Sequence, residues 1–136
     1  MRETHSDQPE MLICGGTVLG SVTIRGCPSE VATARRFVAK TLGDHPQADT
    51  AVLLTSEAVT NAVIHTASET ITVAVVEIPK GLRFEVVDEG AATLPVVHDA
   101  DELGEGKRGM FLIRELSDRC GFVADGGGLT CWFELS

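Results

Sequence analysis

The chain has 136 residues, 43% of them hydrophobic and 23% charged, which is the composition of one globular domain rather than of a disordered or membrane-spanning protein. Its formal net charge of −9 argues against direct nucleic-acid contact and favours protein partners with basic patches. No apolar run approaches the roughly 20 residues of a membrane-spanning helix. The polar start also lacks a secretory signal, so we expect a cytoplasmic protein without a membrane partner.

The cysteines are scattered along the chain and contain no C-x-x-C pair: Cys14, Cys27, Cys120 and Cys131. Neither they nor the histidines have the spacing of a zinc site. We therefore expect reduced, partly buried thiols.

Residues 1–14 are predicted to form a flexible leader, and residues 15–136 a single domain, because no internal repeat or linker divides them. Residues 16–26 alternate along the chain, which predicts a strand that is weakened at Gly20. In this strand Val18 and Gly20 are expected on the same side.

Two helices are predicted after this strand. The first opens with Pro28 and Ser29, has apolar residues at helical spacing and stops at Gly43. The second is longer, begins near Pro46 and runs to about Thr66.

The next segment reads as a hairpin followed by a loop. Residues 71–78 and 82–89 are β-branched or alternating runs joined by the turn Pro79-Lys80-Gly81. Residues 90–109 have no period, which predicts a long loop, and such a loop in a compact domain is usually functional or disordered.

The chain closes with one more helix and a second hairpin. The helix is predicted from Met110 to near Gly121, followed by a strand at 121–125, a glycine turn and an alternating strand at 128–136. Because strands and helices come in blocks, we expect an α+β fold of two layers with a mostly antiparallel sheet.

The stretch GEGKRG, residues 104–109, matches G-x-G-x-x-G, which is the usual sign of dinucleotide binding. A Rossmann turn needs a buried strand directly before the glycines, yet an acidic segment precedes them. A P-loop needs Ser or Thr after the lysine, yet Arg108 follows Lys107. What remains is an anion site just before a helix, at Gly106, Lys107, Arg108 and Gly109. A plain glycine-rich hinge stays open as the alternative.

Glu57, Asn61 and His65 are spaced four apart on the second helix and form a narrow polar stripe between apolar residues. A solvent face would be broader and would carry Lys or Arg, which do not occur between Lys40 and Lys80. A carboxylate and an amide oxygen one turn apart suit Mg²⁺, and Glu57 is equally suited to orient or deprotonate a nucleophile. The alternative is a solvated Glu57 and a packing Asn61, with His65 as a partner of the helix dipole.

Asp88 ends an apolar strand, and Gly90 follows it in the stretch VVDEG. A carboxylate at a strand end accepts a hydrogen bond from an exocyclic amine, and the glycine lets a flat ring approach the backbone. Asp-x-Gly is also common turn chemistry, so a plain turn remains open.

In chain order, the stretches SEAVTNAVIH, FEVVDEG and GKRGMFLIRELSD resemble the three sequence boxes of the GHKL ATPases, which include histidine kinases, type II topoisomerases and anti-sigma-factor serine kinases. The lead-in ARRFVAKTLG, the short loop between the second and third boxes, and the ending GGGLTCWFEL are most similar to bacterial anti-sigma regulatory factors of the serine/threonine-kinase type. The resemblance covers about residues 18–136.

This resemblance implies the GHKL (Bergerat) ATP-binding fold, in which a mostly antiparallel mixed sheet has helices over one face and ATP lies between helices and a lid. It implies that Asn61 binds Mg²⁺ and that Glu57 is the catalytic base or orients a water. Asp88 would receive the adenine amino group, and Gly90 would line the adenine pocket.

The resemblance also implies that the phosphates are held at the lid and helix start, by Gly106, Lys107, Arg108 and Gly109. Thr130 on the last strand would support Asp88 or a water beside the adenine. Two features depart from the family pattern. Ala92 stands where the second glycine of Asp-x-Gly-x-Gly would be, and the lid carries acidic residues that must point away from the polyphosphate or be neutralised: Asp99, Asp101, Glu102 and Glu105.

By this resemblance we expect a Mg-ATP-dependent serine/threonine protein kinase that doubles as an anti-sigma factor. It would sequester a sigma factor, phosphorylate a serine of a small antagonist protein and form a homodimer. A second hypothesis is a regulatory binding module in which the nucleotide sets the lid and the lid sets partner choice, without phosphoryl transfer. A third is a structural α+β domain that binds no nucleotide.

Overall fold

The structure is a computed structural model that describes residues 16–65, 69–88, 105–125 and 128–136. The predicted leader, Gly90 and most of the predicted loop lie outside these residues. Within the described part, none of the helices is both long and apolar enough to span a membrane.

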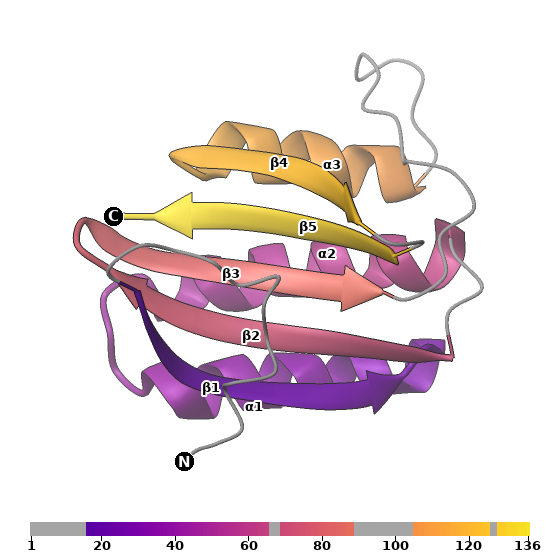
Figure 1. The fold of residues 1–136 in the computed structure, drawn as a ribbon, viewed down its shortest axis with the longest axis horizontal. Helices are drawn as coiled ribbons and strands as arrows, with labels where there is room; N and C mark the ends of the chain where they lie inside the picture. The colour runs from indigo at the N-terminus through magenta and orange to yellow at the C-terminus, as the bar shows by residue number, and fades with distance from the viewer. Residues whose placement is uncertain (1–15, 66–68, 89–104, 126–127) are drawn as a thin grey trace.

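Five strands form one sheet in the order β1-β2-β3-β5-β4 (Figure 1). Each strand pairs antiparallel with its neighbour. This confirms the predicted α+β fold, and the described strands form a purely antiparallel sheet rather than a mixed one. Their bounds are β1 (Thr17–Arg25), β2 (Thr70–Ile78), β3 (Gly81–Asp88), β4 (Arg119–Asp125) and β5 (Gly128–Leu135).

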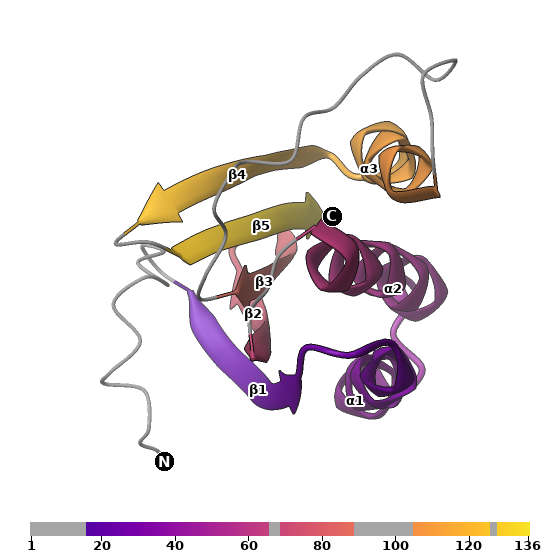
Figure 2. The ribbon, with the colours of Figure 1, turned by 90° about the vertical axis from the view of Figure 1, so that its right-hand side faces the viewer.

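The helices cover one face of this sheet (Figure 2): α1 (Val31–Leu42), α2 (Ala48–His65) and α3 (Glu105–Leu116). α2 lies in the middle and packs against both α1 and α3. A short 3₁₀ turn, η2 (Pro28–Glu30), leads into α1, because proline is tolerated where a helix begins. α1 ends before Gly43, as predicted, and Gly43 adopts a φ of 60° that favours glycine.

The core lies between the sheet and the helices. The rings of Phe84 on β3 and Phe133 on β5 stack with their centroids 4.9 Å apart. Alternate residues of each strand point toward the helices, and Val73 and Val75 of β2 are fully buried among them, as is Leu54 of α2. This packing holds α2 over β3, the strand that ends in Asp88.

β1 contains an irregularity that its alternation did not predict. Its register against β2 shifts between Val18 and Gly20. Val18 therefore pairs with Val76 on the sheet face away from the helices and is 43% exposed. The prediction that Val18 shares a side with Gly20 is thus wrong. Gly20 faces α1, where an added Cβ would lie 3.4 Å from the Phe37 ring.

The predicted start of the third helix is wrong. α3 begins at Glu105, so residues 105–109 belong to the helix and not to the predicted loop 90–109. Gly106 and Gly109 lower the helix propensity of this segment. The packing of α3 against α2 compensates for that cost.

The predicted end of this helix is also wrong, because α3 stops at Leu116 and not near Gly121. The Ser117 hydroxyl donates a 2.6 Å hydrogen bond to the Ile113 carbonyl oxygen and closes the last turn. The backbone N–H of Asp118 then donates to the Glu134 carbonyl oxygen at 2.9 Å. Sheet pairing therefore takes over at this point, and β4 starts at Arg119.

Candidate functional site

The polar stripe of α2 lies where this helix meets the sheet and α3. Asn61 is 4% exposed, Glu57 is half-buried, and His65 is exposed at the end of the helix. Ala58 and Ala62 flank Asn61, and their small side chains let the helix approach the sheet beside the amide. The stripe is therefore split, with Glu57 and Asn61 in the interior and His65 outside.

The structure brings Asn61 and Asp88 to one cavity between α2 and the sheet. Asp88 is the last residue of β3 and is 3% exposed. The described residues enclose about 10 Å³ here, close to the least space that holds one water molecule. The rest of the wall consists of apolar and thiol side chains: Ala58, Ala62, Val86, Phe122, Leu129 and Cys131. The enclosed space is too small for a ring, but a carboxylate and an amide beside apolar side chains are suited to hydrogen-bond the amine of a ring that lies against them.

Glu57 contacts α3 at Gly109. An added Cβ on Gly109 would lie 2.6 Å from Glu57 Oε1 and 3.3 Å from Glu57 Cβ. Gly109 is buried in this contact. The absence of a side chain at Gly109 thus lets the carboxylate of α2 reach the first turns of α3.

The first turn of α3 contains the other residues that we predicted for phosphate binding: Gly106, Lys107 and Arg108. The first four N–H groups of a helix have no acceptor within the helix, and the positive end of its dipole lies there. We expected these residues just before a helix, whereas the structure places them inside its first turn. Their backbone is thus a donor array for an anion. The side chains of Lys107 and Arg108 are not among the described parts.

Thr130 is not brought to the cavity. Its register partner is Val87, and its neighbours Leu129 and Cys131 line the cavity. Since successive side chains of a strand point to opposite faces, Thr130 points away from Asp88, and it is 8% exposed. The structure thus places Thr130 and Asp88 on opposite faces of the sheet, while support of a water beside the adenine by Thr130 stays a prediction, and Gly90 lies outside the described residues.

Sequence reasoning predicted only Asn61 and Asp88 of the cavity wall, and the residues that it missed include three from β4 and β5: Phe122, Leu129 and Cys131. The alternation in residues 128–136 places Leu129 and Cys131 on one side, which is a usable signal. Phe122 lies in the predicted strand 121–125. Because the predicted helix extends to near Gly121, that strand is too short to show which side is buried.

Burial, and to a smaller extent the neighbouring Cys120, raises the pKa of the Cys131 thiol from 9.0 to about 12. Cys131 is therefore a neutral thiol at neutral pH. It contributes apolar surface to the cavity and is not activated as a nucleophile.

Residues 25–134 match the family model described as the histidine kinase-like ATPase domain. Because this match spans most of the chain, the protein belongs to that family, and the family implies ATP binding. The fold is also that of a solved structure, "The crystal structure of the RsbU and RsbW domains of Rv1364c from Mycobacterium tuberculosis", with a TM-score of 0.61 and 20% identity. The match covers 85% of this chain but only 32% of that one. No curated protein matches the sequence significantly.

The described residues contain no group of three or more His, Cys, Asp or Glu side chains that could form a protein-only metal cage. Mg²⁺ does not need such a cage, because it is usually held by one or two protein oxygens together with phosphates and water. On α2, the buried Asn61 carries an amide oxygen and the half-buried Glu57 a carboxylate one turn away, which are oxygen donors of this kind. The residues present therefore fit a magnesium–nucleotide complex.

Proposed function

We propose that the protein is a Mg-ATP-dependent serine/threonine protein kinase of the anti-sigma-factor type. In this role it phosphorylates a serine of an antagonist protein and sequesters a sigma factor in the cytoplasm, either alone or as a homodimer. The single observation that best supports the proposal is the contact between Glu57 and Gly109. This contact places the Glu57 carboxylate beside the start of α3, where the backbone N–H groups are suited to bind phosphates.

Each part of the site has a task in this proposal. Asp88 accepts a hydrogen bond from the adenine amine, and the N–H groups at the start of α3 hold the phosphates. Asn61 holds Mg²⁺, and the metal neutralises phosphate charge when it is bound. Lys107 and Arg108 add positive charge.

Glu57 is the catalytic residue in this proposal. Its carboxylate accepts the proton of the serine hydroxyl as the serine oxygen bonds to the γ-phosphorus, the bond from that phosphorus to the β–γ bridging oxygen breaks, and ADP leaves. Phosphoryl transfer requires mainly positioning and charge stabilisation, and the contact between α2 and α3 provides the positioning.

The test is transfer of labelled γ-phosphate to an antagonist protein. Glu57→Gln keeps the shape of the side chain but removes its basicity, so transfer should fall at least about 100-fold, the usual contribution of a general base, while Mg-ATP still binds. Wild-type protein that binds Mg-ATP and labels no antagonist would disprove the kinase proposal. That result would favour the nucleotide-gated binding module, which needs the same cavity and helix start.

A further inference from the structure

A groove of about 460 Å³ lies at the opposite end of β3 and β5 from the candidate nucleotide cavity. Asp88 and Leu129 pair at the cavity end of these strands, whereas Leu82 and Leu135 pair at the groove end. The volume falls within the range of about 300–1,000 Å³ that is typical of ligand pockets. The groove is therefore large enough for a ligand of its own, separate from the proposed ATP site.

The groove has an apolar floor, formed by Ile78, Pro79 and Leu135. Ile78 ends β2 and Pro79 belongs to the turn between β2 and β3, and this turn packs closely on the end of β5. Gly81 makes the packing possible, because an added Cβ there would collide with the Leu135 carbonyl oxygen. The floor is thus held in place before any ligand binds.

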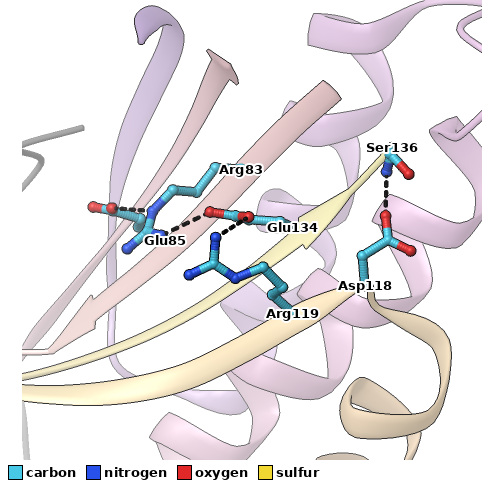
Figure 3. Close-up of polar contacts among 6 residues, drawn as sticks. All are labelled: Arg83, Glu85, Asp118, Arg119, Glu134 and Ser136. Carbon is cyan, nitrogen blue, oxygen red and sulfur yellow. Dashed lines mark hydrogen bonds and ion pairs between the residues drawn. The ribbon is translucent and has the colours of Figure 1, made fainter. Parts of the chain in front are cut away.

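The acidic side chains of the groove are already engaged (Figure 3). Asp118 Oδ2 accepts a 2.6 Å hydrogen bond from the backbone N–H of Ser136. Glu134 Oε2 accepts a 3.0 Å hydrogen bond from Arg83, and Glu134 Oε1 lies 3.5 Å from a guanidinium nitrogen of Arg119. The Glu134 carboxylate is therefore paired mainly with Arg83, and the Asp118 carboxylate keeps its charge but is held by a backbone N–H.

The basic side chains of the groove remain accessible. Lys80 is exposed, and no ion pair among the described residues involves it. The Arg119 side chain is 70% exposed, and its 3.5 Å contact with Glu134 is of the weak, solvent-screened kind. The guanidinium also lies 5.6 Å from the centroid of the Trp132 ring, which orients it without using its N–H donors. Both cations can therefore bind an incoming carboxylate.

We propose that this groove binds a short segment of a partner protein that presents an acidic side chain beside aliphatic ones. The aliphatic groups lie on the floor of Ile78, Pro79 and Leu135, and the carboxylate lies between Lys80 and Arg119. The lining comes from the β2–β3 turn, the start of β4 and the end of β5, so an extended peptide bridges three segments of the chain. Because the accessible charges of the groove are the cations Lys80 and Arg119, we expect an acidic rather than a basic side chain in the occupant.

The test uses two blocked tripeptides, acetyl-Leu-Asp-Leu-amide and its neutral analogue acetyl-Leu-Asn-Leu-amide. Trp132 is the only tryptophan of the chain and contacts Arg119, so its fluorescence reports occupancy. The acidic peptide should bind at least fivefold more tightly than the neutral one, as a charge-assisted contact requires. Lys80→Gln and Arg119→Gln should each remove most of that difference.

Lys40→Gln is the matched control, because Lys40 is an exposed cation of α1 that lies outside the groove. It should leave the binding of both peptides unchanged. Equal binding of the two peptides, binding of neither, or an equal loss in the Lys40 variant would overturn the proposal. A Mg-ATP titration of the same proteins keeps the two proposals apart, since loss of ATP binding refutes the nucleotide site alone.

Discussion

Gly109 of α3 lies directly against the carboxylate of Glu57 on α2, so closely that an added Cβ would come within 2.6 Å of Glu57 Oε1. A glycine inside a helix usually costs stability relative to alanine, by about 0.5–1 kcal/mol. Here the glycine lies at the contact between α2 and α3. This contact joins the Glu57 carboxylate to the helix start proposed to hold the phosphates.

Gly109→Ala should therefore destabilise the protein, although alanine favours a helix. The Cβ would meet both Oε1 and the Cβ of Glu57, and overpacking of this kind costs about 1–3 kcal/mol. Urea denaturation measures the change. ATP turnover or phosphoryl transfer should fall as well, because the carboxylate is displaced.

The double variant Glu57→Ala/Gly109→Ala distinguishes this contact from a general effect on α3. Removal of the Glu57 side chain beyond Cβ relieves the closest clash, so the two changes should be non-additive by about 0.5–3 kcal/mol. Additive losses, or a stabilised Gly109→Ala protein, would contradict the contact.

Asn61→Ala should make nucleotide binding independent of magnesium. Because Asn61 is the proposed protein ligand of Mg²⁺, the variant should bind ATP in EDTA as the wild type does and should lose the increase in affinity that Mg²⁺ gives. Calorimetric titration with and without Mg²⁺ measures both. A variant that keeps the full magnesium effect would assign the metal to another group.

Asp88→Asn should weaken ATP binding without removing its magnesium dependence. The change replaces an acceptor-only oxygen with an amide donor opposite the adenine amine, and loss of a charge-assisted hydrogen bond costs about 1.5–3 kcal/mol. The expected change in Kd is about tenfold to 100-fold. GTP offers a control, because its ring carries an oxygen where adenine carries the amine. Equal loss of ATP and GTP binding would point to a structural role for Asp88.

The stability of the protein should fall as pH rises from about 9 toward about 12, in part because of Cys131. The folded-state pKa of this thiol is raised, so the unfolded chain loses the proton first, and its free energy falls relative to that of the folded protein as pH rises. The contribution of the protonated Cys131 thiol to the free energy of unfolding is fully present below pH 9.0. It is lost as pH rises to about 12, with a slope of up to about 1.4 kcal/mol per pH unit.

Cys131→Val replaces the thiol with a slightly larger apolar side chain and removes the titrating group. In urea titrations on both sides of pH 9.0, the variant should lose less stability at alkaline pH than the wild type. The same pH dependence in both proteins would show that the thiol is not buried as described.

Arg83 should contribute more to stability than Arg119, although both contact Trp132 and Glu134. The Arg83 side chain is 16% exposed, lies 2.8 Å from a carboxylate oxygen of the fully buried Glu85, and stacks 4.2 Å from the centroid of Trp132. Removing one partner of a buried ion pair costs about 3–5 kcal/mol, whereas an exposed pair contributes about 0–1 kcal/mol. Thermal denaturation of Arg83→Met and Arg119→Met compares the two, and similar losses would contradict this assignment.

Local sequence patterns predicted the layers of the fold and most element boundaries. Period-two and helical spacing depend on which side of an element is buried, so they located β2, β3 and α2 to within a few residues. The same patterns failed at both ends of α3. Gly106 and Gly109 are poor helix formers, so the pattern did not indicate the helix start. At the other end, the backbone N–H of Asp118 donates to the Glu134 carbonyl oxygen and not to the helix. Both failures involve contacts with residues distant in the sequence.

The candidate site was predictable where its residues share one element. Glu57 and Asn61 lie one turn apart on α2, and Asp88 ends its strand, so their placement followed from periodicity. The contact between Glu57 and Gly109 could not be predicted from periodicity, because it depends on how α3 packs on α2. Thr130 shows the opposite problem, since the register of β5 decides which of two neighbouring residues points into the cavity.

The connectivity of β4 has a consequence for how the molecule opens. Among the described strands β4 pairs only with β5, and it follows α3 directly in the chain, so these two elements can come away together while β1, β2, β3 and β5 stay paired. Their amide hydrogens should exchange with solvent earlier than those of β2 and β3. The helix proposed to hold the phosphates thus lies next to an edge strand in the chain, and a bound nucleotide would stabilise both elements against such opening.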